Sequence, residues 1–317
     1  NSTSGLSSLQ SNSITVSTSG SVVGNYKTQY YLTLATSPPG VTTPSGQGWY
    51  YNGTYASIST PEIVPTACPC TRYRFDSWTT AEMAEITDPA LPSTTVLMDN
   101  FKTVTANYVT QYRVTFDQTG LSPDANGTVV NVDGATKTLG DLPFEIYVDK
   151  DSSVIYFYAP IVTSNVSGKR FRLVSVTGPS SPINVTGPMD VVGNYKTQYL
   201  LTVRTDPAGL NPQPTRIPEG EGGGWWYDSS TPVNLTAQLV TNYDFLNWDV
   251  DTNPVSGNPI TVPMNGSHVA TAHYEWAAPP AVGGYAATID IAMGKEASHL
   301  LVSQIGLAFA LLTAMAV

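Results

Sequence analysis

Charged residues are scarce in this chain. Only 12% of its 317 residues are Asp, Glu, Lys or Arg, against roughly a quarter in ordinary soluble domains. The 24 acidic and 14 basic residues leave a formal charge of −10, and an acidic surface repels the phosphate backbone of nucleic acids. We therefore expect no nucleic-acid partner. Hydrophobic residues make up 41% of the chain, which excludes a disordered polypeptide and is enough for two or three buried cores.

Signatures of catalysis and metal binding are also missing. Two cysteines cannot build a disulfide framework or a four-thiolate zinc site. The chain contains no GxSxG, HExxH, Walker or GxGxxG motif, and His268, His273 and His299 are scattered. Residues 149–153 and 249–253 open like calcium loops but lack the later Gly and Glu, so solvated turn carboxylates are the preferred interpretation. We predict no catalytic residue, no metal site and no cofactor.

Acceptor patterns for N-glycosylation are frequent. Asn-x-Ser/Thr occurs seven times, whereas chance would supply roughly four in a chain of this composition. The excess favours a secreted protein whose signal peptide has been removed, although a Ser/Thr-rich β protein also acquires such patterns by accident. The candidate asparagines are Asn1, Asn52, Asn126, Asn165, Asn184, Asn234 and Asn265.

The last residues, 300–317, form an uncharged apolar run. With His299 the run is just long enough to cross roughly 30 Å of hydrocarbon as a helix, and Gly306, Ala310 and Ala314 form a stripe of small residues. No Lys or Arg follows it, so the charge rule for membrane orientation gives no support. A membrane anchor, burial in an assembly, a signal removed on lipid attachment and an ordinary buried helix all stay open.

One phrase recurs along the chain. Residues 22–30 and 191–199 are identical over nine positions, VVGNYKTQY, and related phrases occupy 104–112 and 269–276. The tyrosines of the four phrases are Tyr26, Tyr108, Tyr195 and Tyr274. Their spacings of 82, 87 and 79 residues are too long for the turns of a solenoid and suit small complete domains in tandem.

Apolar and polar residues alternate throughout, as at 30–36 and 199–205, and no segment before residue 285 keeps a helical period. Residues 94–108 and 260–274 each place a polar turn between alternating runs, as a β-hairpin does. We predict an all-β fold of three tandem β-sandwich or β-grasp-like domains, plus a short C-terminal hydrophobic helix. The predicted parts are an N-terminal arm and hairpin at 1–26, domains at 27–108, 109–195 and 196–276, a spacer at 277–299 and the tail at 300–317.

The first and third units share further motifs. The Tyr-x-Phe-x-x-Trp pattern occurs at 73–78 and 243–248, and Gly-Trp-Tyr-Tyr at 48–51 matches Gly-Trp-Trp-Tyr at 224–227. With the closing hairpins, these motifs resemble the divergent internalin-B-type B-repeats of bacterial and archaeal surface proteins. The phrase YRVTFDQTGL at 112–121 resembles modules of archaeal surface proteins and modules found beside thermopsin-like proteases.

These resemblances imply a secreted cell-surface protein of tandem domains, and identify a scaffold without an activity. Phe75, Trp78, Phe245 and Trp248 are expected in the cores. For the Gly-Trp motifs, one of each adjacent aromatic pair should face inward, and a core role is preferred to an exposed platform for sugars.

The hairpin phrase that closes each unit also stands where no unit precedes it, at residues 14–26. Strand backbone groups need partners, and an unpaired apolar edge invites pairing with another chain. The segment is a local extension of the first domain, a remnant of a longer precursor, or a strand donated to a neighbouring subunit through Ile14, Val16, Val22 and Val23. We hypothesise donation, because a head-to-tail contact that does not close gives a filament.

Cys68 and Cys70 are separated by one proline. They form a small ring, bridge to another subunit or stay reduced, and an oxidising exterior favours a disulfide of some kind.

The predicted function is a non-enzymatic, glycosylated structural protein of the cell surface that polymerises with copies of itself. The polymer is expected to be a pilus- or thread-like filament or a surface layer, with membrane lipid as a second partner through the tail. The alternative is a membrane-anchored stalk or adhesin, and a remote third interpretation is a thermopsin-like secreted peptidase.

Overall fold

The computed structural model describes residues 2–5, 19–81 and 85–277. Strands dominate this part of the chain, which confirms the predicted all-β class. Its helical elements are a short 3-10 turn, η2 (Leu139–Asp141), and the one-turn helix α1 (Glu221–Gly224). Within the described ranges, neither helical element has the length and hydrophobicity of a membrane-spanning helix. The predicted tail helix at 300–317 lies outside them.

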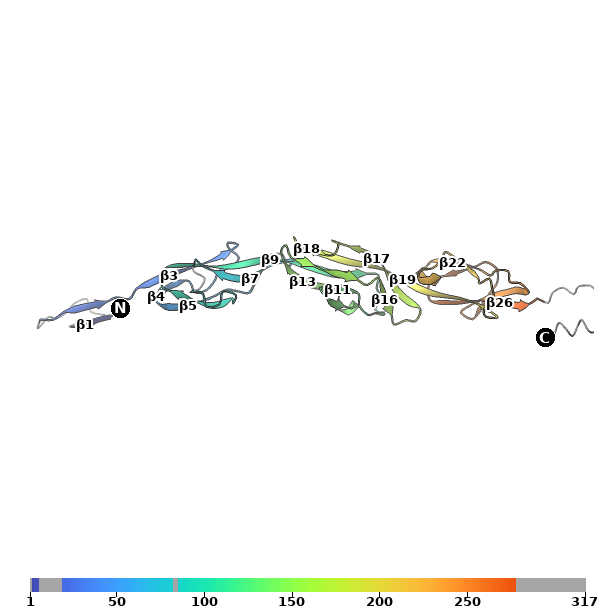
Figure 1. Cartoon of the computed structure of the whole chain (residues 1–317), viewed down its shortest axis with the longest axis horizontal. Helices are drawn as coiled ribbons and strands as arrows, with labels where there is room; N and C mark the ends of the chain where they lie inside the picture. Colours follow the sequence, from blue (N-terminus) through green and yellow to red (C-terminus); the bar gives the residue numbers. More distant parts are fainter. Residues whose placement is uncertain (1, 6–18, 82–84, 278–317) are drawn as a thin grey trace, which may run out of the picture.

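Three domains follow one another along the long axis of the molecule, each with its own hydrophobic core (Figure 1). Trp78 is fully buried in the first core, Phe116 and Phe171 in the second, and Trp248 in the third. Phe245 packs against the third core in a partly buried position. The aromatic residues of the Tyr-x-Phe-x-x-Trp motifs are therefore core residues, as predicted.

The first domain is a sandwich of two sheets. In one sheet β3 runs parallel to β9, and β7 pairs antiparallel with the other edge of β9. The second sheet is the antiparallel pair β5–β8, whose buried residues face the same core. The strands are β3 (Gln29–Ser37), β4 (Gly48–Tyr51), β5 (Thr54–Ser59), β6 (Ile63–Pro65), β7 (Thr71–Thr79), β8 (Ser93–Met98) and the first half of β9 (Lys102–Thr119).

The second domain begins with the rest of β9 and ends in β19. The second half of β9 pairs parallel with the first half of β19, as β3 does with β9 in the first domain. Its elements are β10 (Ala125–Asn126), β11 (Val130–Val132), β12 (Ala135–Lys137), β13 (Phe144–Asp149), β14 (Ser153–Val154), β15 (Tyr156–Tyr158), β16 (Ile161–Ser164), β17 (Lys169–Thr177), β18 (Ile183–Asn184) and the first half of β19 (Met189–Asp206).

The third domain repeats the strand pairing of the first. The second half of β19 pairs parallel with β26, β23 pairs antiparallel with β26, and β22 pairs with β25 as β5 does with β8. Its strands are β20 (Thr215–Ile217), β21 (Trp226–Asp228), β22 (Pro232–Thr236), β23 (Tyr243–Val250), β24 (Asn253–Val255), β25 (Ile260–Pro263) and β26 (His268–Trp276).

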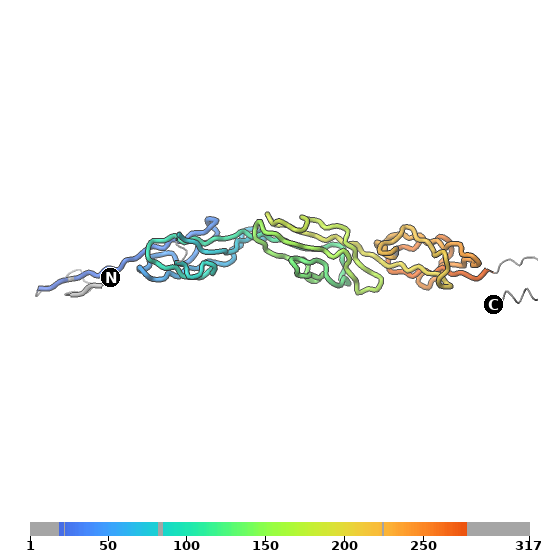
Figure 2. The backbone as a smooth tube through the Cα atoms, in the orientation of Figure 1, coloured from blue at the N-terminus to red at the C-terminus, as the bar shows by residue number. Residues whose placement is uncertain are grey.

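The strands β9 and β19 cross from one domain into the next (Figure 2). Each is 18 residues long, and the predicted borders at 108/109 and 195/196 fall inside them. The chain continues as a strand there because the phrases at 106–112 and 193–199 contain no proline or turn that would break the alternation. The closing strand of one domain is therefore the opening strand of the next, and no flexible linker separates the domains.

The N-terminal strands form a separate two-stranded sheet beyond the first domain (Figure 1). β2 (Val22–Asn25) pairs antiparallel with β1 (Ser2–Gly5). Among the described residues, neither strand is hydrogen-bonded to a strand of the first domain. Ile14 and Val16, expected opposite Val22 and Val23 in a hairpin, lie outside these residues.

Candidate assembly interface

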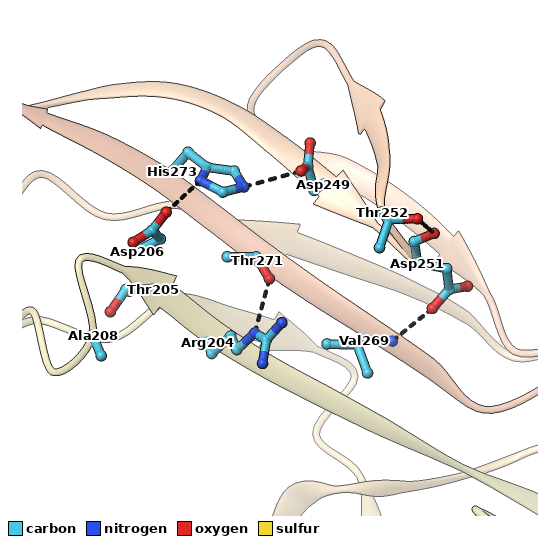
Figure 3. A pocket seen from close by; sticks show the side chains of 10 residues that line it. All are labelled: Arg204, Thr205, Asp206, Ala208, Asp249, Asp251, Thr252, Val269, Thr271 and His273. Carbon is cyan, nitrogen blue, oxygen red and sulfur yellow. Dashed lines mark hydrogen bonds and ion pairs between the residues drawn. The ribbon is translucent and has the colours of Figure 1, made fainter.

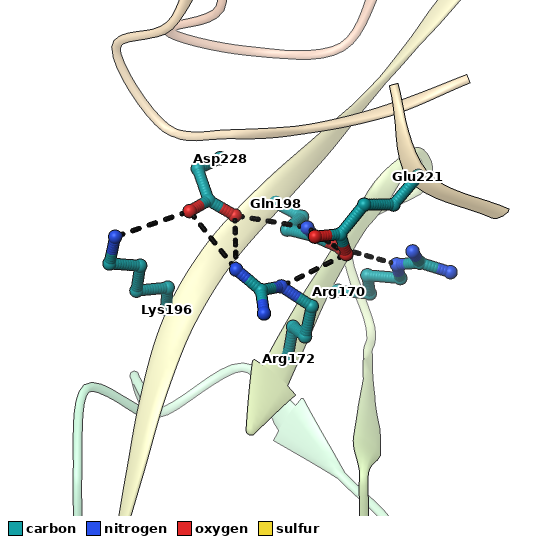
Figure 4. A network of polar contacts seen from close by, with 6 residues as sticks. All are labelled: Arg170, Arg172, Lys196, Gln198, Glu221 and Asp228. Atoms are coloured by element: carbon teal, nitrogen blue, oxygen red, sulfur yellow. Dashed lines mark hydrogen bonds and ion pairs between the residues drawn. The ribbon is translucent and has the colours of Figure 1, made fainter. Parts of the chain in front are cut away.

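The junction between the second and third domains is held by a polar network around Gln198 (Figure 4). Arg170 and Arg172 are two residues apart on β17 and so project from one face of the strand. Arg170 Nε donates to Gln198 Oε1 at 2.9 Å, and Gln198 Nε2 donates to Asp228 Oδ1 at 3.0 Å. Arg172 Nη2 reaches Asp228 Oδ2 at 3.2 Å. Residues of three strands, β17, β19 and β21, are thereby tied across the domain border.

Two further ions and an aromatic ring complete this junction. Lys196 Nζ lies 3.3 Å from Asp228 Oδ2, and Arg172 Nε lies 3.0 Å from Glu221 Oε2. Burial acts to raise the pKa of Asp228, but hydrogen bonds from Gln198, Lys196 and Arg172 outweigh it and hold that pKa below its ordinary value. The Arg170 guanidinium stacks 4.3 Å from the centre of the Trp226 ring, and burial lowers the pKa of this arginine.

The junction between the first and second domains has the same design. Arg72 Nε donates to Gln111 Oε1 and Gln111 Nε2 donates to Asp149 Oδ1, both at 2.7 Å. Arg74 Nη2 donates to Asp149 Oδ2 at 2.8 Å, and this hydrogen bond lowers the pKa of the Asp149 carboxyl. Arg72 stacks on Tyr147, with its guanidinium carbon 4.0 Å from the ring centre. Each junction thus joins an Arg-x-Arg strand of the upstream domain to a Gln, a carboxylate and an aromatic ring.

The cysteine pair lies at this first junction. Cys68 and Cys70 form a disulfide within the chain. The Cys70 carbonyl accepts a hydrogen bond from the Arg113 amide at 2.9 Å, and the Pro69 carbonyl accepts one from the Tyr147 hydroxyl. The small ring therefore shapes a loop of the first domain that caps the second.

The first domain presents the same site, and the described residues place no domain against it on the upstream side. Strand register places Trp49 where Tyr147 and Trp226 stand, because these residues lie opposite Tyr31, Arg113 and Leu200 on the neighbouring strands. Trp49 is 65% exposed and Tyr51 is 45% exposed. Trp49 contacts Tyr31 edge-on, with ring centres 5.3 Å apart. We call the surface formed by Gln29, Tyr31, Trp49 and Tyr51 the leading face.

The Gly-Trp motifs are aligned by this register with a shift of one residue. Trp49 corresponds to Trp226, not to Trp225 as the sequence match placed it. Tyr50 packs partly buried against the first core, whereas Trp49 and Tyr51 point outward. The alternation of the strand was predicted correctly, but the preferred core role applies to one residue of each motif, Tyr50 in the first and Tyr227 in the second.

At the C-terminal end of the third domain, the residues that correspond to the Arg-x-Arg pairs of the two junctions are not arginines. Asn242 and Asp244 stand where the first domain has Arg72 and Arg74, since Phe245 and Phe75 pair with equivalent tyrosines. Asp244 lies directly opposite Glu275 on β26. Trp276 packs edge-on against Tyr243 and stays 59% exposed. We call Asn242, Asp244, Glu275 and Trp276 the distal end.

The repeated tyrosine is buried in three positions and exposed in one. Tyr108, Tyr195 and Tyr274 are 5–6% exposed, whereas Tyr26 is 87% exposed. Each buried hydroxyl donates to a backbone carbonyl: Tyr108 to Pro61 at 2.7 Å, Tyr195 to Ala159 at 2.9 Å and Tyr274 to Gln238 at 2.8 Å. Burial raises the pKa of all three phenols. Tyr26 therefore belongs to a segment whose equivalents are core strands.

The six candidate glycosylation sites within the described ranges are all on the surface. Asn1 lies outside those ranges. The exposed asparagines are Asn52, Asn126, Asn165, Asn184, Asn234 and Asn265.

The third domain also carries an open depression of about 620 Å³ (Figure 3). His273 bridges Asp206 and Asp249 there, at 3.0 Å and 3.1 Å, in the position that Asn107 and Asn194 occupy in the other domains. Asp251, from one calcium-like stretch, instead accepts hydrogen bonds from the Val269 amide at 2.9 Å and lies 2.6 Å from His268 Nδ1. Across residues 2–5, 19–81 and 85–277, no group of three or more His, Cys, Asp or Glu side chains could hold a metal ion.

Residues 30–111 match the family model of the Divergent InlB B-repeat domain. The match spans the first domain and confirms the predicted resemblance for that unit. This kind of β domain is typical of cell-surface proteins and typically non-catalytic. No curated protein matches the chain.

Sequence reasoning missed the junction networks. The signal was present as two Arg-x-Arg strands, TRYRF at 71–75 and KRFRL at 169–173, each followed by a Thr-Gln-Tyr triplet at the start of the next domain. The partner carboxylates could not be found in this way, because they lie 23 or more residues from the glutamines they bind.

Proposed function

We propose that this chain is a non-enzymatic structural protein of the cell surface, a rod of β domains that joins end to end with copies of itself into an extracellular filament or layer. The observation that carries the proposal is the state of residues 22–30. Their sequence is identical to that of 191–199, yet Tyr26 is 87% exposed where Tyr195 is 5% exposed. Among the described residues, the strand β2 of this segment pairs only with β1, and Tyr26 joins none of the three hydrophobic cores. We infer that a segment with the sequence of a core strand in this state binds to another copy.

The shared strands support a mechanical role. β9 and β19 carry backbone hydrogen bonds through both domain borders, and the arginine networks clamp the side chains at the same places. Separate domains on flexible linkers reorient freely, whereas domains with a common strand move as one body. A stiff rod suits a subunit that bears load along its length.

Surface chemistry supports an extracellular setting. Six sequon asparagines are exposed and sterically open to modification, and Cys68 and Cys70 are paired. Glycans would add the hydration that a surface with few charges lacks. Production in an N-glycosylating host, followed by intact mass before and after enzymatic deglycosylation, tests this part of the proposal.

Electron microscopy of the full-length chain secreted by such a host tests the polymer. We expect fibres or sheets with a repeat close to the length of the three-domain rod, and we expect a variant lacking residues 1–26 to stay monomeric in light scattering. Monomeric rods from the intact chain at all concentrations, or unchanged polymers from the shortened chain, would contradict the proposal.

A membrane-anchored stalk or adhesin is the second candidate function, and the leading face favours it. Exposed Trp and Tyr rings bind the apolar faces of sugars in many recognition sites, and Trp49 and Tyr51 offer such rings at the end of the rod. Binding of the monomer to a glycan array, lost on Trp49→Ala, would support this function. The predicted anchor at 300–317 lies outside the described residues. Most of the phrase at 112–121 that resembles modules beside thermopsin-like peptidases lies in the shared strand β9, where it has a structural role.

A further inference from the structure

Building on the proposed end-to-end assembly, we infer that residues 22–28 of one copy replace residues 270–276 in the third domain of a second copy. The incoming strand lies between β19 and β23, the place that β26 holds within the chain. The juxtaposition that specifies this register is Lys27 of the incoming copy opposite Asp244 of the acceptor.

The register follows from the burial of the closing strands. In β26 the inward side chains are Ala270, Ala272 and Tyr274, all buried. The aligned positions of the incoming strand are Val22, Gly24 and Tyr26. The same three residue types fill the corresponding slot of the second domain as Val191, Gly193 and Tyr195, so this set of side chains already packs inside one domain of the chain. The larger Val and the smaller Gly keep the total volume close to that of two alanines.

Charge favours the incoming strand over the resident one. Asp244 and Glu275 lie directly opposite each other on β23 and β26, and like charges at opposed positions destabilise a sheet. The incoming strand places Lys27 at the position of Glu275, opposite Asp244. Lys196 holds the equivalent strand position in the second domain, where the residue opposite it is Arg172. Two neighbouring carboxylates are then replaced by a carboxylate and an ammonium group.

The exchange would also join two copies through a shared strand, as neighbouring domains are joined within the chain. β2 leads directly toward β3, so a strand entering the acceptor runs on into the first domain of its own copy, as β9 and β19 run across their borders. The leading face of the incoming copy then contacts the distal end of the acceptor, and Trp49 and Tyr51, which are exposed in the single chain, become buried. The charges are reversed relative to the internal junctions, where the upstream domain supplies the cations. Because the distal end carries carboxylates where the internal junctions have arginines, it does not compete for the partners of those junctions.

Burial of the tyrosine does not drive the exchange, because Tyr274 leaves the core as Tyr26 enters it. The balance depends on the relieved carboxylate pair and on the newly covered leading face. The exchange is thus a form of domain swapping, which depends on protein concentration and needs β26 to open first.

Disulfide trapping tests the register. In the full-length chain, Lys27→Cys with Asp244→Cys should give a ladder of covalent oligomers on non-reducing gels, since opposed residues of antiparallel strands lie within disulfide reach. Lys27→Cys with Asp249→Cys is the matched control, because Asp249 lies five residues farther along β23, and it should give no ladder. Wild-type polymers with no ladder from the first pair would overturn the register and leave the proposed function standing. A chain that never polymerises would overturn both.

Charge variants test the driving force. Lys27→Glu should raise the protein concentration needed for assembly about fivefold to tenfold, because an opposite-charge pair with Asp244 is lost and a like-charge pair takes its place. Adding Asp244→Lys and Glu275→Lys to that variant gives an opposite-charge pair in the assembled state and a like-charge pair in the monomer, and should restore assembly. Lys150→Glu changes the net charge equally at an exposed turn and should have no effect. Equal effects of Lys27→Glu and Lys150→Glu, or no recovery in the triple variant, would overturn the role assigned to Lys27.

Discussion

Arg74 of the first domain and Asp149 of the second are joined by two hydrogen bonds, from Nη2 to Oδ2 at 2.8 Å and from Nε to Oδ1 at 3.3 Å. The two residues are 75 positions apart in the chain and stand on β7 and β13, strands of different domains. They lie on opposite edges of β9, since β7 and β13 both pair with Gln111 and Tyr112 of that strand. A side-chain bridge therefore spans the border that β9 crosses through its backbone.

Removing this bridge should loosen the first junction without unfolding either domain. Arg74→Ala is expected to lower the free energy of unfolding by about 1 kcal/mol, because both groups are about one-third exposed and solvent screens the pair. Gln111 still donates to Asp149 and preserves part of the network. Urea unfolding measures the loss, and small-angle scattering should show a wider spread of interdomain angles.

Arg113→Ala is the matched control for this variant. The ion pair of Arg113 with Glu145, at 3.2 Å, has similar exposure but lies wholly within the second domain. It should change stability by less than about 1 kcal/mol and leave the scattering profile unchanged. Equal broadening of the profile in both variants would show that the bridge does not set the junction angle.

The second domain should lose stability in acid through Asp124. Hydrogen bonds from Ser122 first, then Ser164 and Lys169, hold the pKa of the Asp124 carboxyl far below its ordinary value of 3.8. A carboxyl whose pKa is depressed by folding stabilises the fold above its unfolded pKa, and this contribution disappears as the pH falls through the folded pKa. We therefore expect stability to decline below about pH 4, measured as the thermal midpoint of the second domain.

Asp124→Asn tests the assignment. The amide keeps the shape but cannot titrate, so the variant should be less stable at pH 7 and should show a flatter decline below pH 4 than the wild type. Asp133→Asn changes a carboxylate elsewhere in the same domain and controls for net charge. If the acid decline is equally steep in the Asp124 variant, other carboxylates are responsible for it.

Some features of the fold could be predicted from the sequence because they depend on local alternation. The strands and the core positions of Phe75 and Trp78 are examples. The domain borders predicted at 108/109 and 195/196 assumed that each repeated tyrosine ends a unit. The alternation of buried and exposed residues continues through both phrases, and so does the strand. The match of Trp49 to Trp225 failed by one residue because the glycine stretch before Trp225 forms α1, with Gly222 and Gly223 at positive φ, before β21 begins. The junction networks depend on strand register between distant segments, which local pattern does not encode.

The disulfide should matter more for the first junction than for overall stability. Replacing Cys68 and Cys70 together by Ser is expected to lower the free energy of unfolding by only about 1–2 kcal/mol, since the closed loop is very short and constrains the unfolded chain little. The larger effect should be faster hydrogen exchange at the Arg113 amide, whose acceptor is the Cys70 carbonyl. Tyr147→Phe removes only the hydroxyl that donates to Pro69 and should have a smaller effect on that amide. Unchanged exchange after reduction of the disulfide would contradict the proposed role of the ring.

The two identical phrases contain equivalent glycines, Gly193 in a strand packed in the second core and Gly24 in a strand outside the three cores. Substituting each glycine compares the two environments directly. A Cβ on Gly193 would lie 2.5 Å from the Tyr158 ring in the second core, whereas the nearest atom to one on Gly24 is the Tyr26 ring at 3.2 Å. Gly193→Ala should therefore destabilise the second domain by about 1–3 kcal/mol through overpacking. Gly24→Ala should leave the monomer unchanged, because the exposed Tyr26 ring can move aside. The Tyr158 hydroxyl, which donates to Asp117 O at 2.7 Å, limits how far that ring can give way. Thermal unfolding of both variants beside the wild type makes the measurement, and equal losses at the two glycines would show that residues 22–26 are already packed within their own chain.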